Sequence, residues 1–196
     1  MNMNAYSPQI IVGACVILLV FMLVIAWAVK RQRDRKRTTE LRGRFGPEYE
    51  VALVHYGSRR RAEAALEGRV RRVEQFSLRP LSVTEQKRFV TEWDAIQGRF
   101  IDHPRGAVTE ADELINSILH VKGYPGGTFQ QRAADMSVHH PQMVDAVRRG
   151  NEITVRAGRN EASTEELRTA MILYRSLFEE LVESKTLEIP PQAQAA

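Results

Sequence analysis

Histidine and carboxylate side chains are the residues best suited to metal binding or catalysis, and the chain places one group of them close together. His139 and His140 are adjacent, and Asp135 precedes His139 by four residues. Imidazole and carboxylate groups are common zinc ligands and acid–base catalysts. Adjacent histidines point in different directions, however, and Pro141 marks a helix start. We therefore interpret His140 as an exposed residue at a helix N-terminus; a metal- or ligand-binding site or a hydrolase centre in this region is the alternative.

Other signatures of catalysis are missing from the sequence. The His-Glu-x-x-His pattern of zinc proteases and the Gly-x-Ser-x-Gly pattern of serine hydrolases do not occur. The glycine-rich segment 123–127 lacks the Lys-Ser/Thr pair of a phosphate-binding loop. Cys15 is the only cysteine, so an intramolecular disulfide is excluded. We predict a protein that is not an enzyme, with no cofactor and no bound metal.

Basic residues concentrate immediately after a long apolar run. Residues 10–29 contain no charged side chain, and 20 residues in a helix span about 30 Å, the thickness of the hydrocarbon layer of a bilayer. Residues 1–9 contain no Lys or Arg, which favours an uncleaved signal anchor over a cleaved signal peptide. The basic residues that follow are expected to contact the anionic inner leaflet and to fix the topology: Lys30, Arg31, Arg33, Arg35, Lys36 and Arg37.

By the positive-inside rule, this charge distribution predicts a single-pass protein of a bacterial inner membrane. Its N-terminus would lie outside and its C-terminal domain in the cytoplasm. The low Lys content (5 of 28 basic residues) agrees with a bacterial chain encoded by GC-rich DNA.

A second set of arginines suggests phosphate or lipid headgroups as possible ligands. They are Arg59, Arg60, Arg61, Arg69, Arg71 and Arg72. A run of charges usually forms a solvated helix face, and the interleaved aromatic residues of single-strand binders are missing. We therefore predict no nucleic acid partner.

Helical periodicity dominates the rest of the chain. Phe89, Trp93, Ile96 and Phe100 recur on one helical face, and Ser82 with Glu85 has the spacing of a capping box. Further apolar faces are predicted within residues 62–73, 107–119 and 167–181. Thr128 and Gln131 resemble a second capping box, and Ser163 with Glu166 a third. No segment shows the alternation typical of β-strands.

These patterns predict an all-α protein with a transmembrane helix, a helical stalk and a small bundle-like helical domain. The expected boundaries are an extracytoplasmic N-terminus at 1–9, the membrane helix at 10–29, a basic segment and stalk at 30–80, the helical domain at 81–185, and a disordered tail at 186–196.

Several motifs resemble a family of uncharacterised bacterial single-pass membrane proteins. The segments that carry the resemblance are Leu-Arg-Gly-Arg-Phe-Gly-Pro-Glu-Tyr at 41–49 and Phe-Gln-Gln-Arg-Ala-Ala-Asp-Met-Ser-Val at 129–138. The resemblance implies the same topology and no assigned activity. The expected function is thus a membrane-anchored cytoplasmic module, a tether or adaptor that acts through contact with an unknown protein partner.

Overall fold

The computed structural model describes the backbone of residues 8–183 and the side chains from residue 17 onward. The chain forms two compact units, Met1–Arg44 and Phe45–Ala196, which are described separately below. Every regular element between residues 8 and 183 is a helix, and no strand occurs in that range. The prediction of an all-α protein is confirmed.

The described part of the N-terminal unit is helix α1, which spans Pro8–Phe45 and so extends one residue past the unit boundary. The transmembrane helix predicted at 10–29 is wrong for the described residues, because none of their helices is long and apolar enough to cross a bilayer. The described apolar side chains from Ile17 to Val29 are exposed, and charged residues follow from Lys30. The side chains of residues 10–16 lie outside the described part of the structure. The predicted inner-membrane topology depended on this helix and is corrected together with it.

Gly46 and Pro47 separate the first two helices. Gly46 has a φ of 49°, which favours glycine, and Pro47 occupies the first turn of α2 (Pro47–Tyr56). Gly57 then ends α2 in the left-handed conformation. Helix α3 (Arg59–Val73) follows, with the Ser58 hydroxyl accepting a hydrogen bond from the amide of Arg61.

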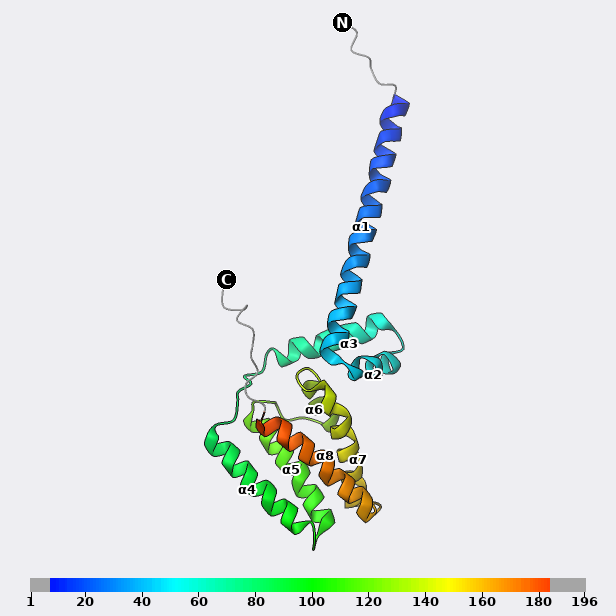
Figure 1. Ribbon diagram of the computed structural model, residues 1–196. Coiled ribbons are helices and arrows are strands. Elements are labelled where there is room, and N and C mark those ends of the chain that lie inside the picture. Colours follow the sequence, from blue (N-terminus) through cyan, green and yellow to red (C-terminus); the bar gives the residue numbers. More distant parts are fainter. Residues whose placement is uncertain (1–7, 184–196) are drawn as a thin grey trace. The chain divides into compact units, whose positions relative to one another are not determined.

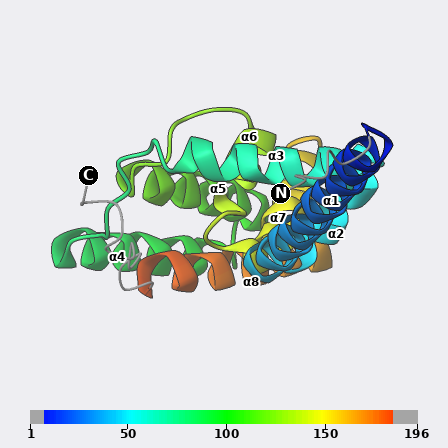
Figure 2. The same cartoon turned by 90° about the horizontal axis from the view of Figure 1, so that it is seen from above.

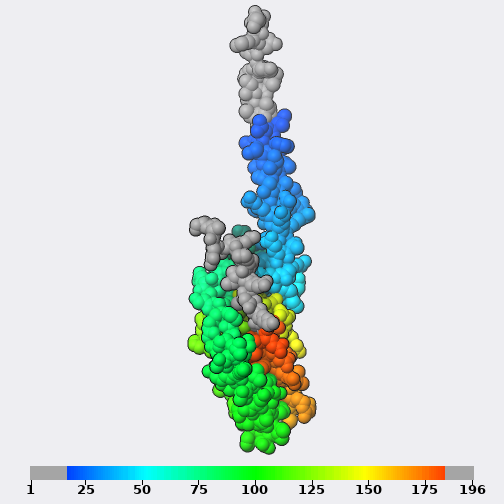
Figure 3. All heavy atoms as spheres, turned by 60° about the vertical axis from the view of Figure 1, so that its left-hand side comes forward, coloured from blue at the N-terminus to red at the C-terminus, as the bar shows by residue number. Residues whose placement is uncertain are grey.

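Four helices form the bundle that contains most of the core: α4 (Val83–Arg99), α5 (Pro104–Val121), α7 (Val144–Gly158) and α8 (Thr164–Glu183). Helix α8 packs against both α5 and α7, and α4 packs against α5 (Figure 1). The predicted apolar faces point inward; Phe89, Trp93 and Ile96 of α4 are buried. The Trp93 ring stacks on Phe178 of α8 with 5.0 Å between ring centroids. Helices α4 and α8 accordingly lie side by side in Figures 2 and 3.

Two local details differ from the sequence prediction. The segment after His140 begins as a 3-10 turn, η1 (Pro141–Met143), before α7 starts. Helix α6 (Phe129–Met136) has only half of a capping box: the Thr128 hydroxyl accepts a hydrogen bond from the amide of Gln131. The Gln131 side chain instead donates to Asp135 Oδ1 at 3.1 Å, because that carboxylate lies one helical turn away.

Helices α2 and α3 belong to the same compact unit as the bundle. Helix α3 packs against α6, α2 packs against η1, and α6 packs against α7 (Figure 1). Segments from residues 47–73 and 128–148 are thereby brought together at one end of the bundle.

Candidate binding groove

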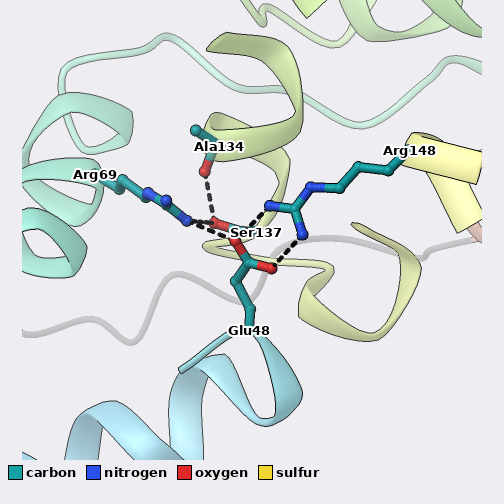
Figure 4. A network of polar contacts seen from close by, with 5 residues as sticks. All are labelled: Glu48, Arg69, Ala134, Ser137 and Arg148. Atoms are coloured by element: carbon teal, nitrogen blue, oxygen red, sulfur yellow. Dashed lines mark hydrogen bonds and ion pairs between the residues drawn. The ribbon is translucent and has the colours of Figure 1, made fainter. Parts of the chain in front are cut away.

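Glu48 is a buried carboxylate that joins three helices. It lies in the first turn of α2 with 3% of its surface exposed. Arg69 of α3 donates from Nη1 to its Oε1 at 2.9 Å. Arg148 of α7 donates from Nη2 to Oε1 at 2.7 Å and from Nη1 to Oε2 at 2.9 Å (Figure 4). Two guanidinium groups therefore neutralise one carboxylate, and their charge-assisted bonds fix α2 to α3 and α7.

Ser137 extends this network toward α6. Arg69 Nη1 also donates to Ser137 Oγ at 3.2 Å, and that hydroxyl donates to the carbonyl of Ala134 at 2.6 Å (Figure 4). Ser137 is fully buried and follows the last residue of α6. The hydroxyl thus links the Arg69 side chain to the C-terminal turn of α6.

Asp135 is a second buried carboxylate in this region. Arg72 donates from Nε to Oδ1 and Oδ2, at 3.1 and 3.4 Å, and Gln131 contacts Oδ1 as well. The Arg72 guanidinium also lies over the ring of Phe76, 5.5 Å from its centroid. A carboxylate on one side and an aromatic ring on the other hold this guanidinium in one orientation.

The ion pairs of Glu48 and Asp135 border a groove of about 870 Å³ formed by α2, α3, α6 and α7. Arginine, small apolar and aromatic side chains predominate on its walls. The lining residues are Glu48, Val51, Ala52, His55, Tyr56, Ala65, Gly68, Arg69, Arg72, Thr128, Phe129, Gln130, Gln131, Ala133, Ala134 and Arg148. A volume of this size is within the range of ligand-binding clefts.

The histidine region predicted from the sequence does not form a metal site. Asp135 is bound by Arg72, His140 Nδ1 lies 2.9 Å from Glu180 Oε1, and His139 Nδ1 lies 3.4 Å from the Tyr124 hydroxyl. Among the described residues, no group of three or more His, Cys, Asp or Glu side chains is placed to hold a metal ion. His139, His140 and Asp135 are therefore not brought together as ligands.

The interpretation of His140 as an exposed residue is also wrong. It does precede the first turn of η1, but its side chain is buried against Glu180 of α8. Burial lowers the pKa of the imidazole, while its hydrogen bond to Glu180 acts in the opposite direction. The sequence correctly indicated a helix start after His140, but it did not indicate that α8 covers the His140 side chain.

Lys122 is a second buried base near Glu180. It follows the last residue of α5, and its Nζ donates to the carbonyl of Leu181 at 2.9 Å. Burial lowers the pKa of this amine, and the charge of Glu180 raises it. The contact satisfies a backbone acceptor in the last turn of α8, where a cation is favourable.

The six basic residues predicted to lie at a membrane surface all belong to α1. Lys30, Arg31, Arg33, Arg35 and Lys36 are exposed, and Arg37 is half-buried. The Arg31 guanidinium lies 5.1 Å from the centroid of the Trp27 ring.

The arginines of α3 do not form one uniform solvated face. Arg71 is largely exposed and pairs with Glu67, whereas Arg69 and Arg72 point toward α6. Their three-residue spacing places both on one side of α3, a signal already present in the sequence. Their partners were missed because Glu48, Asp135 and Ser137 lie 21, 63 and 68 residues away from them.

Comparison of the chain with protein-family models, curated proteins and solved structures gives no match.

Proposed function

We propose that the unit beginning at Phe45 is a protein-contact module, a tether or adaptor without a reaction of its own, and that the groove between α2, α3, α6 and α7 is its contact surface. The observation that carries the proposal is the groove itself, whose walls come from helices fastened by the Glu48 and Asp135 ion pairs. A surface held in one conformation loses less entropy when a partner binds.

The composition of the walls supports the same proposal. Arginine and aromatic side chains are enriched at protein interfaces, and the groove contains Arg69, Arg72, Arg148, Tyr56 and Phe129. Val51 of α2 is a large apolar residue that lines the groove and is 46% exposed. An apolar residue in a groove that arginines also line is typical of a site that a protein segment covers.

Site-specific photo-crosslinking tests this function in cells that naturally produce the chain. A photoreactive amino acid replaces Val51 in the groove, and, as a matched control, Ile172 on the exposed side of α8, outside the groove. We expect a discrete protein adduct from position 51 and not from position 172. The protein identified by mass spectrometry should then bind the purified chain and be displaced by groove variants. Equal adducts from both positions, or none from position 51, contradict the proposal.

A further inference from the structure

The charges of the groove are arranged so that a ligand would meet cations rather than anions. The two carboxylates are buried: the Glu48 and Asp135 side chains are 3% and 2% exposed, and only Glu48 lines the groove. Their partners extend outward, with 44% of the Arg72 side chain and 38% of the Arg148 side chain exposed. Three arginines and one buried carboxylate, that of Glu48, line the groove, so its accessible surface is basic.

The ion pair of Arg72 with Asp135 does not use all the hydrogen-bond donors of the guanidinium group. Only its Nε contacts Asp135. Neither terminal nitrogen of this guanidinium has a hydrogen-bond partner among the described residues. The group is nevertheless oriented, because Asp135 and the ring of Phe76 both hold it. An oriented guanidinium with its terminal nitrogens available matches the two oxygens of a carboxylate.

Apolar surface lies next to these donors. Val51 of α2 and Phe129 of α6 line the same groove, and Ala65, Gly68 and Ala133 keep it open because their side chains are small. A ligand that is complementary to both the arginine donors and the apolar surface carries carboxylates and apolar side chains on one face. Amphipathic acidic protein segments have this character, whereas the apolar part offers nothing to a nucleic acid backbone.

We infer that the groove between α2, α3, α6 and α7 binds an acidic, amphipathic segment of a partner protein, with a carboxylate on Arg72 and an apolar side chain between Val51 and Phe129. The inference rests on the proposed function and specifies the chemistry of the partner. Charge complementarity selects this occupant, since the exposed charges of the groove are guanidinium groups.

The test measures the fluorescence anisotropy of labelled 12-residue peptides titrated with the full-length protein. One peptide alternates Glu and Leu at helical spacing, a second has Gln in place of Glu, and a third has Lys. We expect saturable binding of the Glu peptide that weakens as salt is added, and at least tenfold weaker binding of the other two. Equal binding of the Glu and Gln peptides would overturn the inference.

A pair of variants on α2 locates the binding site without disturbing the ion pairs. Val51→Glu places a negative charge in the groove, whereas Val54→Glu places it on the same helix at a residue that is 86% exposed and does not line the groove. Both substitutions are at solvent-accessible positions, and melting curves verify that both variants fold. Val51→Glu should weaken binding of the Glu peptide at least tenfold and Val54→Glu less than twofold. Equal effects would overturn the assignment to this groove.

A second pair examines the assigned guanidinium. Arg72→Lys keeps a positive charge but loses the planar donor pair; Arg71→Lys is the control, because Arg71 does not line the groove. Only Arg72→Lys should weaken binding of the Glu peptide. A single-stranded oligonucleotide that displaces the peptide and depends equally on Arg72 would replace this inference with nucleic acid binding.

The outcomes separate the inference from the proposed function. If a partner is captured at position 51 and binds the purified chain through a segment without acidic residues, the contact function stands and the inferred chemistry is wrong. If the Glu peptide binds but no partner is captured at position 51, the inferred groove chemistry stands and the proposed function is contradicted.

Discussion

Glu48 shows how one side chain determines the placement of several elements. Its carboxylate is buried, and the guanidinium groups of Arg69 and Arg148 compensate for the loss of hydration. Removal of this charge leaves two cations facing each other without their counterion.

We predict that Glu48→Gln lowers the free energy of unfolding by about 2–3 kcal/mol. The value lies below the roughly 3–5 kcal/mol of a fully buried pair, because water reaches part of Arg148. Urea denaturation measures the change. Glu92→Gln is the control, since Glu92 forms an exposed pair with Arg88 on α4, and its effect should stay within about 0.5 kcal/mol. A Glu48→Gln variant as stable as the control would show that the network adds nothing to stability.

His140 gives the stability a dependence on pH. Burial lowers its pKa in the folded protein below the ordinary value of about 6.5, so the unfolded chain binds the proton more tightly. The contribution is therefore complete above about pH 6.5 and is lost as the pH falls from there toward the lowered pKa. Glu180 contacts the imidazole, Gln142 donates to the same Glu180 oxygen, and the charge of Lys122 acts on the imidazole as well.

We predict that the melting temperature of the wild-type protein falls between about pH 6.5 and 5 more steeply than that of His140→Gln. Glutamine keeps a donor for Glu180 but does not titrate. Calorimetry across this range compares the two proteins, and the other histidines contribute equally to both. Parallel curves would mean that His140 does not titrate differently in the folded and unfolded chains.

The N-terminal caps of α4 and α8 are formed by residues that lie close together in the sequence. The Ser82 hydroxyl accepts a hydrogen bond from the amide of Glu85, and the Glu85 carboxylate accepts one from the amide of Ser82. Ser163 and Glu166 repeat this arrangement before α8. Arg79 also pairs with Glu85, and these contacts lower the pKa of the Glu85 carboxyl to about 2. The contribution of this carboxylate is present above about pH 4.5 and is lost as the pH falls toward 2.

We predict that Ser82→Ala lowers the free energy of unfolding by about 1 kcal/mol, the usual effect of removing an N-terminal cap. The same variant should raise the pKa of Glu85, because it removes the Ser82 side-chain hydrogen bond that lowers this pKa, while the backbone amide of residue 82 still donates to the carboxylate. Denaturation and a carboxyl NMR titration measure the two effects. Ser176→Ala, within α8 and exposed, is the control and should leave both quantities unchanged.

The unit that begins at Phe45 has some features that can be predicted from the sequence and others that cannot. Capping boxes and apolar faces involve residues three or four positions apart, so Ser82, Trp93 and Leu177 were assigned correctly. The groove instead depends on contacts between distant residues, such as Glu48 with Arg148, 100 positions apart. Local patterns cannot identify such pairs. The apolar run before Lys30 also led to a wrong prediction, because no helix of the described residues is long and apolar enough to cross a bilayer.

We predict that a fragment comprising residues 45–196 unfolds in one cooperative transition. Glu48 links α2 to α7 and Asp135 links α6 to α3, so these helices should not melt before the bundle. Trp93 is the only tryptophan of this fragment and reports the core, since its ring is buried against Phe178. Its fluorescence and the circular dichroism at 222 nm should change at the same temperature. Separate transitions would contradict a single cooperative unit.

The position of Lys122 has a consequence for chemical labelling. Its amine is enclosed and donates to the carbonyl of Leu181, so an acylating reagent reaches it only when the end of α8 detaches. Lys87 on α4 is exposed and reacts without any such opening. The ratio of the two acylation rates therefore measures how often the last turn of α8 separates from α5, with no substitution introduced into the protein.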